Sequence, residues 1–160
     1  MAVTLIRIVG ARPPAVWAAV CDFAAHAHAM PRTTIWCDAG APGVDWRFVA
    51  RRRVGPLRVD DTMRITYWSP LGEGDEPESG HFELVREGPQ LAGWAQIAVE
   101  PGPTRSSTRL TWREEVTSAR LPLLTRPRVL RRAADVATAR FFDHAIDHFS
   151  AAARSIEAGR

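Results

Sequence analysis

The chain has 160 residues, of which 46% are hydrophobic and 24% are charged. These fractions are ordinary for one soluble globular domain, and they exclude collagen-like, coiled-coil and disordered chains. All 21 basic residues are arginines, so the sequence pI is about 9.6 although the net charge is only +3. A charge this small creates a weak field, which argues against a nucleic-acid partner.

The N-terminal part of the chain predicts a strand followed by two short helices. Residues alternate over Val3–Val9, which is typical of a strand. Pro14 suits the first turn of a helix, and apolar residues at helical spacing continue through Ala15–Phe23. Asp22 is placed to cap a second short helix over Ala24–Ala29, which ends before a proline.

The middle of the chain changes to residue alternation interrupted by glycine and proline turns. The longest alternating segment, Leu57–Trp68, puts apolar residues and one acid, Asp61, on the same face. Regular hairpin spacing predicts that these segments form one antiparallel sheet. The predicted strands are Thr33–Asp38, Asp45–Val54, Leu57–Trp68, His81–Glu87, Leu91–Glu100 and Ser107–Ser118.

The C-terminal part predicts one long helix over Arg128–Ile156, because no proline or glycine interrupts its apolar stripe. At about 1.5 Å per residue this helix would extend roughly 40 Å, enough to cover one face of the sheet. A twisted sheet does not close tightly on one helix. The space between them becomes a cavity unless large side chains fill it, and a filled core remains the alternative.

Large apolar side chains are predicted to face this space. A concave surface rich in aromatic rings suits a flat or hydrophobic small-molecule ligand. The predicted ligand-binding residues are Trp46, Phe48, Met63, Ile65, Trp94, Leu110 and Trp112 from the strands, and Phe141 and Phe149 from the helix.

Two segments resemble a known superfamily. In Pro14–Phe23 a Val-Trp pair precedes an Asp-Phe pair, and a Met-Pro follows. This is similar to the first-helix pattern of the START-related helix-grip (SRPBCC) superfamily, which contains the birch-pollen allergen fold. Thr108–Glu115 is similar to the last strand of its polyketide cyclase/dehydrase-like members. The second short helix departs from the pattern, with Ala-His-Ala-His-Ala where members often carry large aromatic residues.

The resemblance implies one α+β helix-grip domain over residues 1–160. A seven-stranded antiparallel sheet would curl around one long C-terminal helix, with two short helices after the first strand. It also implies a hydrophobic or aromatic ligand between sheet and helix. Members range from aromatase/cyclases to lipid carriers without catalysis, so a cofactor-free polyketide cyclase/dehydratase and a non-catalytic carrier or sensor both stay open. An interaction module using a sheet edge or the Arg126–Arg132 cluster is a third alternative.

Asp61, Glu114 and Tyr67 are the candidate catalytic residues. A carboxylate among aromatic rings is desolvated, which raises its pKa and suits general acid–base work on a carbonyl substrate. Tyr67, the only tyrosine, is placed to orient a substrate oxygen or simply to pack. The alternatives for the acids are a position at the rim or a buried pair with an arginine, for which the candidates are Arg47, Arg52 and Arg64.

Metal and cofactor sites are not expected. His144 and His148 are four residues apart on the predicted helix, but they lack a third ligand, and Asp–His surface pairing explains them equally well. His26 and His28 point in different directions on a helix, so they cannot share one ion. The sequence has no GxGxxG, P-loop or serine nucleophile motif, which argues against a nucleotide or redox cofactor.

The remaining features concern arginines and location. Arg51–Arg53 alternates across a strand and is interpreted as a solvated face. The cluster Arg126–Arg132 opposes the helix dipole, and contact with an anionic ligand head-group or a partner surface is one hypothesis for it. Cys21 and Cys37 form no CxxC and are expected to be reduced core thiols. No apolar run approaches 18 residues, and the first residues lack the secretory-signal pattern. A cytoplasmic protein without a transmembrane segment is expected, with a homodimer left open.

Overall fold

The computed structural model describes residues 2–30, 32–54, 57–72, 78–118 and 147–159. Its strands form one seven-stranded antiparallel sheet in the order β1-β7-β6-β5-β4-β3-β2. Strands β2 to β7 therefore follow one another as hairpins, and β1 pairs with β7. The strands are β1 (Val3–Val9), β2 (Thr33–Cys37), β3 (Arg47–Val54), β4 (Leu57–Ser69), β5 (Gly80–Glu87), β6 (Leu91–Pro101) and β7 (Thr108–Ser118).

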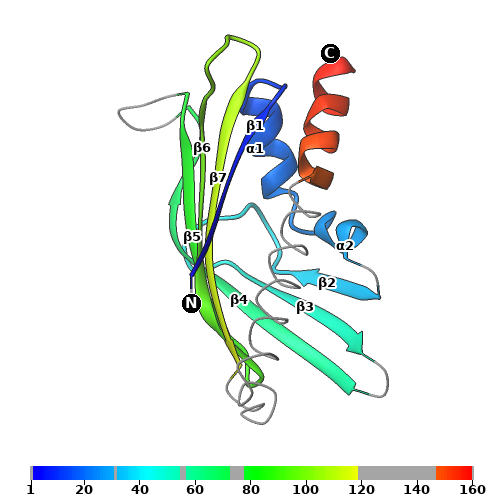
Figure 1. The fold of residues 1–160 in the computed structure, drawn as a ribbon. Helices are drawn as coiled ribbons and strands as arrows, with labels where there is room; N and C mark the ends of the chain where they lie inside the picture. The colour runs from blue at the N-terminus through cyan, green and yellow to red at the C-terminus, as the bar shows by residue number, and fades with distance from the viewer. Residues whose placement is uncertain (1, 31, 55–56, 73–77, 119–146, 160) are drawn as a thin grey trace, which may run out of the picture.

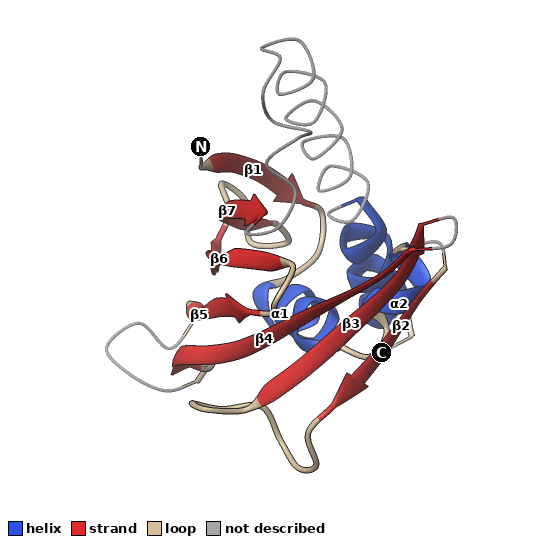
Figure 2. Ribbon diagram, turned by 90° about the horizontal axis from the view of Figure 1, so that it is seen from below, coloured by secondary structure: helices blue, strands red, loops and turns tan. Residues whose placement is uncertain are grey.

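The sheet curves around the helices, which lie on its concave side (Figure 1). Seen from below, the strands form an arc around the two N-terminal helices, α1 and α2 (Figure 2). Helix α1 covers Pro13–Cys21 and α2 covers His26–Ala29, while residues 147–158 form the described part of the C-terminal helix. This arrangement confirms the predicted α+β helix-grip fold.

Local sequence explains where the short helices begin. A proline occupies the first turn of α1, and four small or branched residues of this helix are buried against the sheet: Ala15, Val16, Ala19 and Val20. The Asp22 carboxylate accepts a hydrogen bond from the Ala25 amide at 3.1 Å. Asp22 therefore caps a turn, and α2 begins two residues later than predicted.

The C-terminal helix contacts the rest of the molecule through its apolar side. Phe149 and Ala153 are buried in the core, with the aromatic and branched residues of α1 and the sheet. The part of the predicted helix from residue 128 to residue 146, with Phe141, His144 and the Arg126–Arg132 cluster, lies outside the described residues. In the described ranges, no helix has the length and apolar character needed to cross a membrane.

A β-bulge reverses the alternation near the end of β4. The pairing with β5 shifts between Ile65 and Tyr67, because the residue between them is extra. Tyr67 is consequently 48% exposed on the outer face, and Trp68 turns inward, 5.2 Å from the Trp17 ring. Tyr67 is therefore not placed to orient a ligand in the space between sheet and helix, contrary to the prediction.

Trp94 is the second residue on the unexpected face. On β6 the buried residues are Ala95, Ile97 and Val99, so the period of two puts Trp94 on the outer face. Its side chain hydrogen-bonds Glu115 there. The prediction that Trp94 lines the ligand space is therefore also wrong.

The predictions for Arg51 and for the two cysteines are confirmed only in part. Arg51 pairs with Asp60, Nε to Oδ1 at 2.7 Å, and lies over the Trp36 ring, so it belongs to the solvated face as predicted. Both cysteines are free, as expected. Cys37 is exposed on the edge strand β2, which contradicts its predicted place in the core.

Candidate functional site

A cavity of about 420 Å³ lies on the concave side of the sheet. This volume is within the range of small-molecule sites. The described residues around it come from α2 and its flanks, from β2 to β7 and from the C-terminal helix. They are Phe23, His26, Met30, Thr33, Ile35, Phe48, Ala50, Arg52, Val59, Asp61, Met63, Phe82, Leu84, Arg86, Leu91, Ala95, Trp112, Glu114, Val116 and Phe149.

Aromatic rings form two sides of the cavity. Phe23 lies 4.7 Å from Phe48 and 5.5 Å from Phe82, measured between ring centroids. On the other side Trp112 and Phe149 stack at 6.0 Å with only 15° between their planes. The rings thus pack against one another around the space and give it a largely apolar lining, which suits a ring-bearing ligand.

A buried cluster of three charges interrupts this apolar wall. Arg86 on β5 forms ion pairs with Asp61 on β4, through Nη1 and Oδ2, and with Glu114 on β7, through Nη2 and Oε1. The indole of Trp112 donates to Glu114 Oε2 at 2.8 Å. Glu114 is only 1% exposed and the Arg86 side chain 10%. The two predicted acids therefore meet, and one guanidinium neutralises part of their charge.

The register of the sheet explains how Arg86 reaches β7. Strand β6 lies between β5 and β7, and the residue opposite both Arg86 and Val116 is Gly93. Gly93 carries no side chain that could stand between the guanidinium and Glu114. A Cβ there would overlap the carbonyl oxygen of Glu115, and the φ of +142° also favours glycine.

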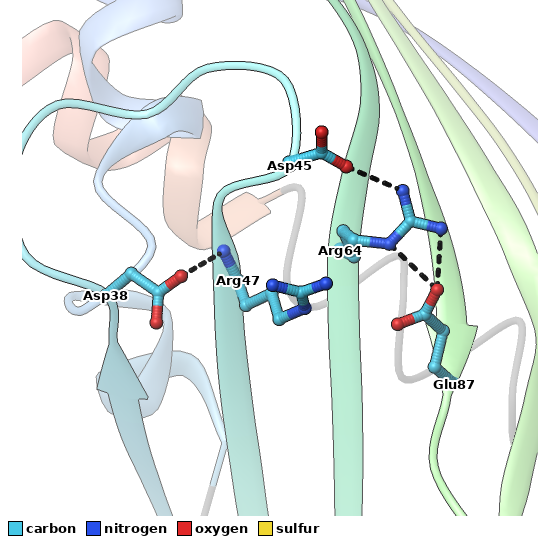
Figure 3. A network of polar contacts seen from close by, with 5 residues as sticks. All are labelled: Asp38, Asp45, Arg47, Arg64 and Glu87. Atoms are coloured by element: carbon cyan, nitrogen blue, oxygen red, sulfur yellow. Dashed lines mark hydrogen bonds and ion pairs between the residues drawn. The ribbon is translucent and has the colours of Figure 1, made fainter.

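Arg86 is the functional residue that sequence reasoning missed. The three arginines considered as partners do not contact the two acids. The backbone amide of Arg47 donates to Asp38, and Arg64 pairs with Asp45 and Glu87 (Figure 3). Arg52 lines the cavity but is exposed. A signal was present, because alternation along β5 already places Arg86 on the same face as Phe82 and Leu84.

Two polar atoms of the cluster are left without partners. Among the described residues, Asp61 Oδ1 and Arg86 Nε are buried and accept or donate no hydrogen bond. Both oxygens of Glu114, in contrast, are engaged, one by Arg86 and one by Trp112. Asp61 and Arg86 thus retain one acceptor and one donor that are buried within the cluster.

His26 is buried at the α2 side of the cavity. Its Nε2 lies 2.8 Å from the Val20 carbonyl, to which it donates, and its ring is 4.3 Å from that of Phe149. Burial is the main cause that lowers the pKa of His26 to about 4. The imidazole is therefore neutral at pH 7.

The structure brings six of the predicted site residues into the cavity wall: Asp61, Glu114, Phe48, Met63, Trp112 and Phe149. Ile65 and Leu110 are fully buried in the core behind it. Trp46 is half-buried against the Phe23 ring and is not among the lining residues. Tyr67 and Trp94 are on the outer face, and Phe141 lies outside the described residues.

No three histidine, cysteine or acidic side chains in the described ranges gather as a metal site would require. His148 is half-buried beside Phe149, and its predicted partner His144 is outside those ranges.

No family model and no curated protein matches this sequence. Several solved structures are similar to it over almost the whole chain. A Thermus thermophilus protein has a TM-score of 0.74 at 9% identity, covering 98% of this chain and 99% of that one. The Zhui aromatase/cyclase from a Streptomyces species has a TM-score of 0.69 at 13% identity, covering 96% and 93%. A START superfamily protein from Mycobacterium smegmatis has a TM-score of 0.65 at 16% identity, covering 91% and 93%. The structural similarity establishes the fold, whereas identities this low leave the chemistry open.

Replacing Arg86 with methionine should destabilise the protein by about 3–5 kcal/mol, because two buried carboxylates lose their counter-charge. Denaturant unfolding measures this loss. The matched control is Arg64→Met, which removes an arginine that also pairs with two carboxylates but at the surface. It should cost far less. Equal losses in the two variants would contradict the buried cluster.

The folded state should lose stability as the pH falls from about 6.5 toward 4. In the unfolded chain His26 takes up a proton near its ordinary pKa of 6.5, whereas in the folded chain its pKa is about 4. Protonation between these pH values therefore favours the unfolded state. Between pH 7 and 4.5 the wild type should therefore lose about 2 kcal/mol more than His26→Gln in urea unfolding. His28→Gln, at an exposed position, should follow the wild type. Parallel curves for all three proteins would refute the assignment.

Proposed function

We propose that this chain, which has the START-related helix-grip fold, binds a hydrophobic, ring-bearing small molecule between its sheet and its C-terminal helix. The observation that supports this most is the cavity of about 420 Å³. Packed phenylalanine and tryptophan rings line this cavity and do not fill it. Burial of a flat apolar ligand there gains roughly 25 cal/mol per Å² of apolar surface removed from water.

Binding can be tested by narrowing the cavity. Val116 is half-buried in the lining, and its neighbour Thr117 is exposed on the opposite face of β7. Val116→Phe should weaken binding of the fluorescent ring compound 2-naphthol at least about tenfold, since the added ring occupies ligand space. Thr117→Phe should leave the affinity unchanged. Fluorescence titration measures both, with circular dichroism to verify folding. Equal affinities would place the ligand elsewhere.

Catalysis at this site is the finer hypothesis, and the alternative is a carrier or sensor with no turnover. The likeness to an aromatase/cyclase and the buried acids favour cofactor-free cyclisation and dehydration of a poly-β-keto chain. Asp61 is the better proton acceptor, because its Oδ1 is unpartnered whereas both Glu114 oxygens are engaged. Glu114 would hold Arg86 and Trp112 in place.

The chemistry follows from these positions. In this scheme the Asp61 carboxylate takes a proton from a carbon between two carbonyls, and the Arg86 guanidinium stabilises the enolate oxygen that forms. The enolate carbon then attacks a second carbonyl that the aromatic walls hold nearby. Asp61, now protonated, returns its proton to the resulting alkoxide. In the dehydration Asp61 removes a second proton from the same carbon and passes it to the leaving hydroxyl, so that a C=C bond forms as the C–O bond breaks and water departs. Tyr67, which was expected to orient the substrate, is on the other face and takes no part in this scheme.

Amide substitutions separate an enzyme from a carrier. Asp61→Asn should lower turnover of a poly-β-keto chain at least about a hundredfold, far more than it weakens binding, because the amide cannot accept the proton. Product formation is followed by mass spectrometry. Asp60→Asn is the matched control, since Asp60 is adjacent in sequence and pairs with Arg51 on the outer face. A carrier would show no turnover in either variant or in the wild type.

A further inference from the structure

Four arginines meet at one corner of the sheet, where the hairpin of β3 and β4 ends beside the start of β2. The register places Arg53 on β3 directly opposite Arg58 on β4, and Arg52 opposite Thr33 on β2. The Arg53 amide donates to the Arg32 carbonyl at 3.3 Å, which brings the fourth arginine to the same place. These four residues form the arginine corner, and the hairpin that carries it ends at the lower right of the molecule in Figure 1.

The side chains of the arginine corner are exposed, with 53% of the Arg58 side chain accessible to solvent. The two segments that build the corner, residues 32–37 and 51–60, contain five arginines and one acid, Asp60. The Asp60 carboxylate forms two hydrogen bonds with Arg51, at 2.7 and 2.8 Å, and lies 3.7 Å from Arg58 Nε. One carboxylate does not offset five guanidinium groups, so these segments are strongly basic in themselves.

The opposed pair of Arg53 and Arg58 does not serve the stability of the sheet. Like charges directly opposite each other on neighbouring strands are destabilising. Exposed side chains also gain little from packing. A negatively charged surface in front of the corner would replace this repulsion with attraction to both guanidinium groups.

The direction of the arginines limits the kind of surface that fits. Alternation along β3 sends Arg52 to the concave face, where it lines the cavity, and Arg53 to the outer face. A fluid layer of lipid headgroups can contact both faces of a hairpin end at once, whereas a rigid protein surface meets one face. The next pair outward is Val54 with Leu57. Apolar residue types beyond arginines suit a bilayer interface, where apolar burial and attraction to anionic lipids add up.

We propose that the arginine corner docks this protein on the surface of an anionic lipid bilayer. Arginines near such a surface are attracted to the negative lipid headgroups, and the attraction falls off within a Debye length. Arg52 belongs both to the corner and to the lining of the cavity, so docking holds the cavity next to the bilayer. The proposal goes beyond ligand binding and does not depend on which compound the cavity binds.

Vesicle flotation with the full chain measures the docking. The wild type should bind phosphatidylcholine vesicles that contain about 30% phosphatidylglycerol at least about tenfold more tightly than pure phosphatidylcholine vesicles. Raising the NaCl concentration from about 0.1 to about 0.5 M should remove most of this binding, because salt screens the exposed arginines.

Two double variants locate the attraction. Arg53→Gln with Arg58→Gln should weaken binding to the anionic vesicles at least about tenfold, since half of the corner's charge is removed. Arg105→Gln with Arg109→Gln is the matched control and should bind as the wild type does. It removes two exposed arginines at the opposite end of the sheet, because successive hairpin turns alternate between the two ends. Urea unfolding should show the Arg53/Arg58 variant to be at least as stable as the wild type.

The outcomes distinguish this proposal from its alternatives. Equal losses in the two double variants would make the attraction a property of the whole protein's charge and overturn a role of the corner. Equal binding to neutral and anionic vesicles would overturn it as well. Binding to polyglutamate but to neither kind of vesicle would identify an acidic protein partner and reject the bilayer. Val116→Phe, which narrows the cavity, should leave vesicle binding unchanged, so a failure of docking is separate from a failure of ligand binding.

Discussion

The site depends on one arginine that holds two carboxylates inside an apolar cavity. Arg86 comes from the middle of the sheet and pairs with Asp61 on one side and Glu114 on the other. Without the guanidinium, two negative charges would face each other among aromatic rings, where water cannot screen them. The ion pairs thus permit acidic groups in a hydrophobic wall. They also connect β4, β5 and β7 beside the cavity.

The curved sheet supplies the space in which this cluster acts. The sheet bends around the helices on its concave side (Figure 2), and the cavity of about 420 Å³ lies on that side. The β4 bulge and Gly93 are local irregularities of the kind that let strands bend. Packing of the rings onto one another, such as Phe23 on Phe48, lines the cavity instead of filling it.

Charged groups interrupt the apolar lining of the cavity. An entirely apolar pocket would bind any hydrophobic molecule of suitable size, because the hydrophobic effect is non-directional. The unpartnered atoms of Asp61 and Arg86 have fixed hydrogen-bonding roles. The Asp61–Arg86–Glu114 cluster thus adds charged, directional groups to a largely apolar lining.

The sequence by itself determined the order of the elements, because alternation, helical spacing and turn residues are local properties. It placed the strands within a residue or two of their observed ends, and it put Asp61, Glu114, Phe48 and Trp112 on the cavity face. Only the tertiary structure decided which partner the acids find, since Arg86 meets Glu114 across an intervening strand at a glycine. It also decided the faces of Tyr67 and Trp94. The bulge in β4 reverses the alternation, so Tyr67 faces outward. On β6, Ala95 and Ile97 face the core, so Trp94 faces outward.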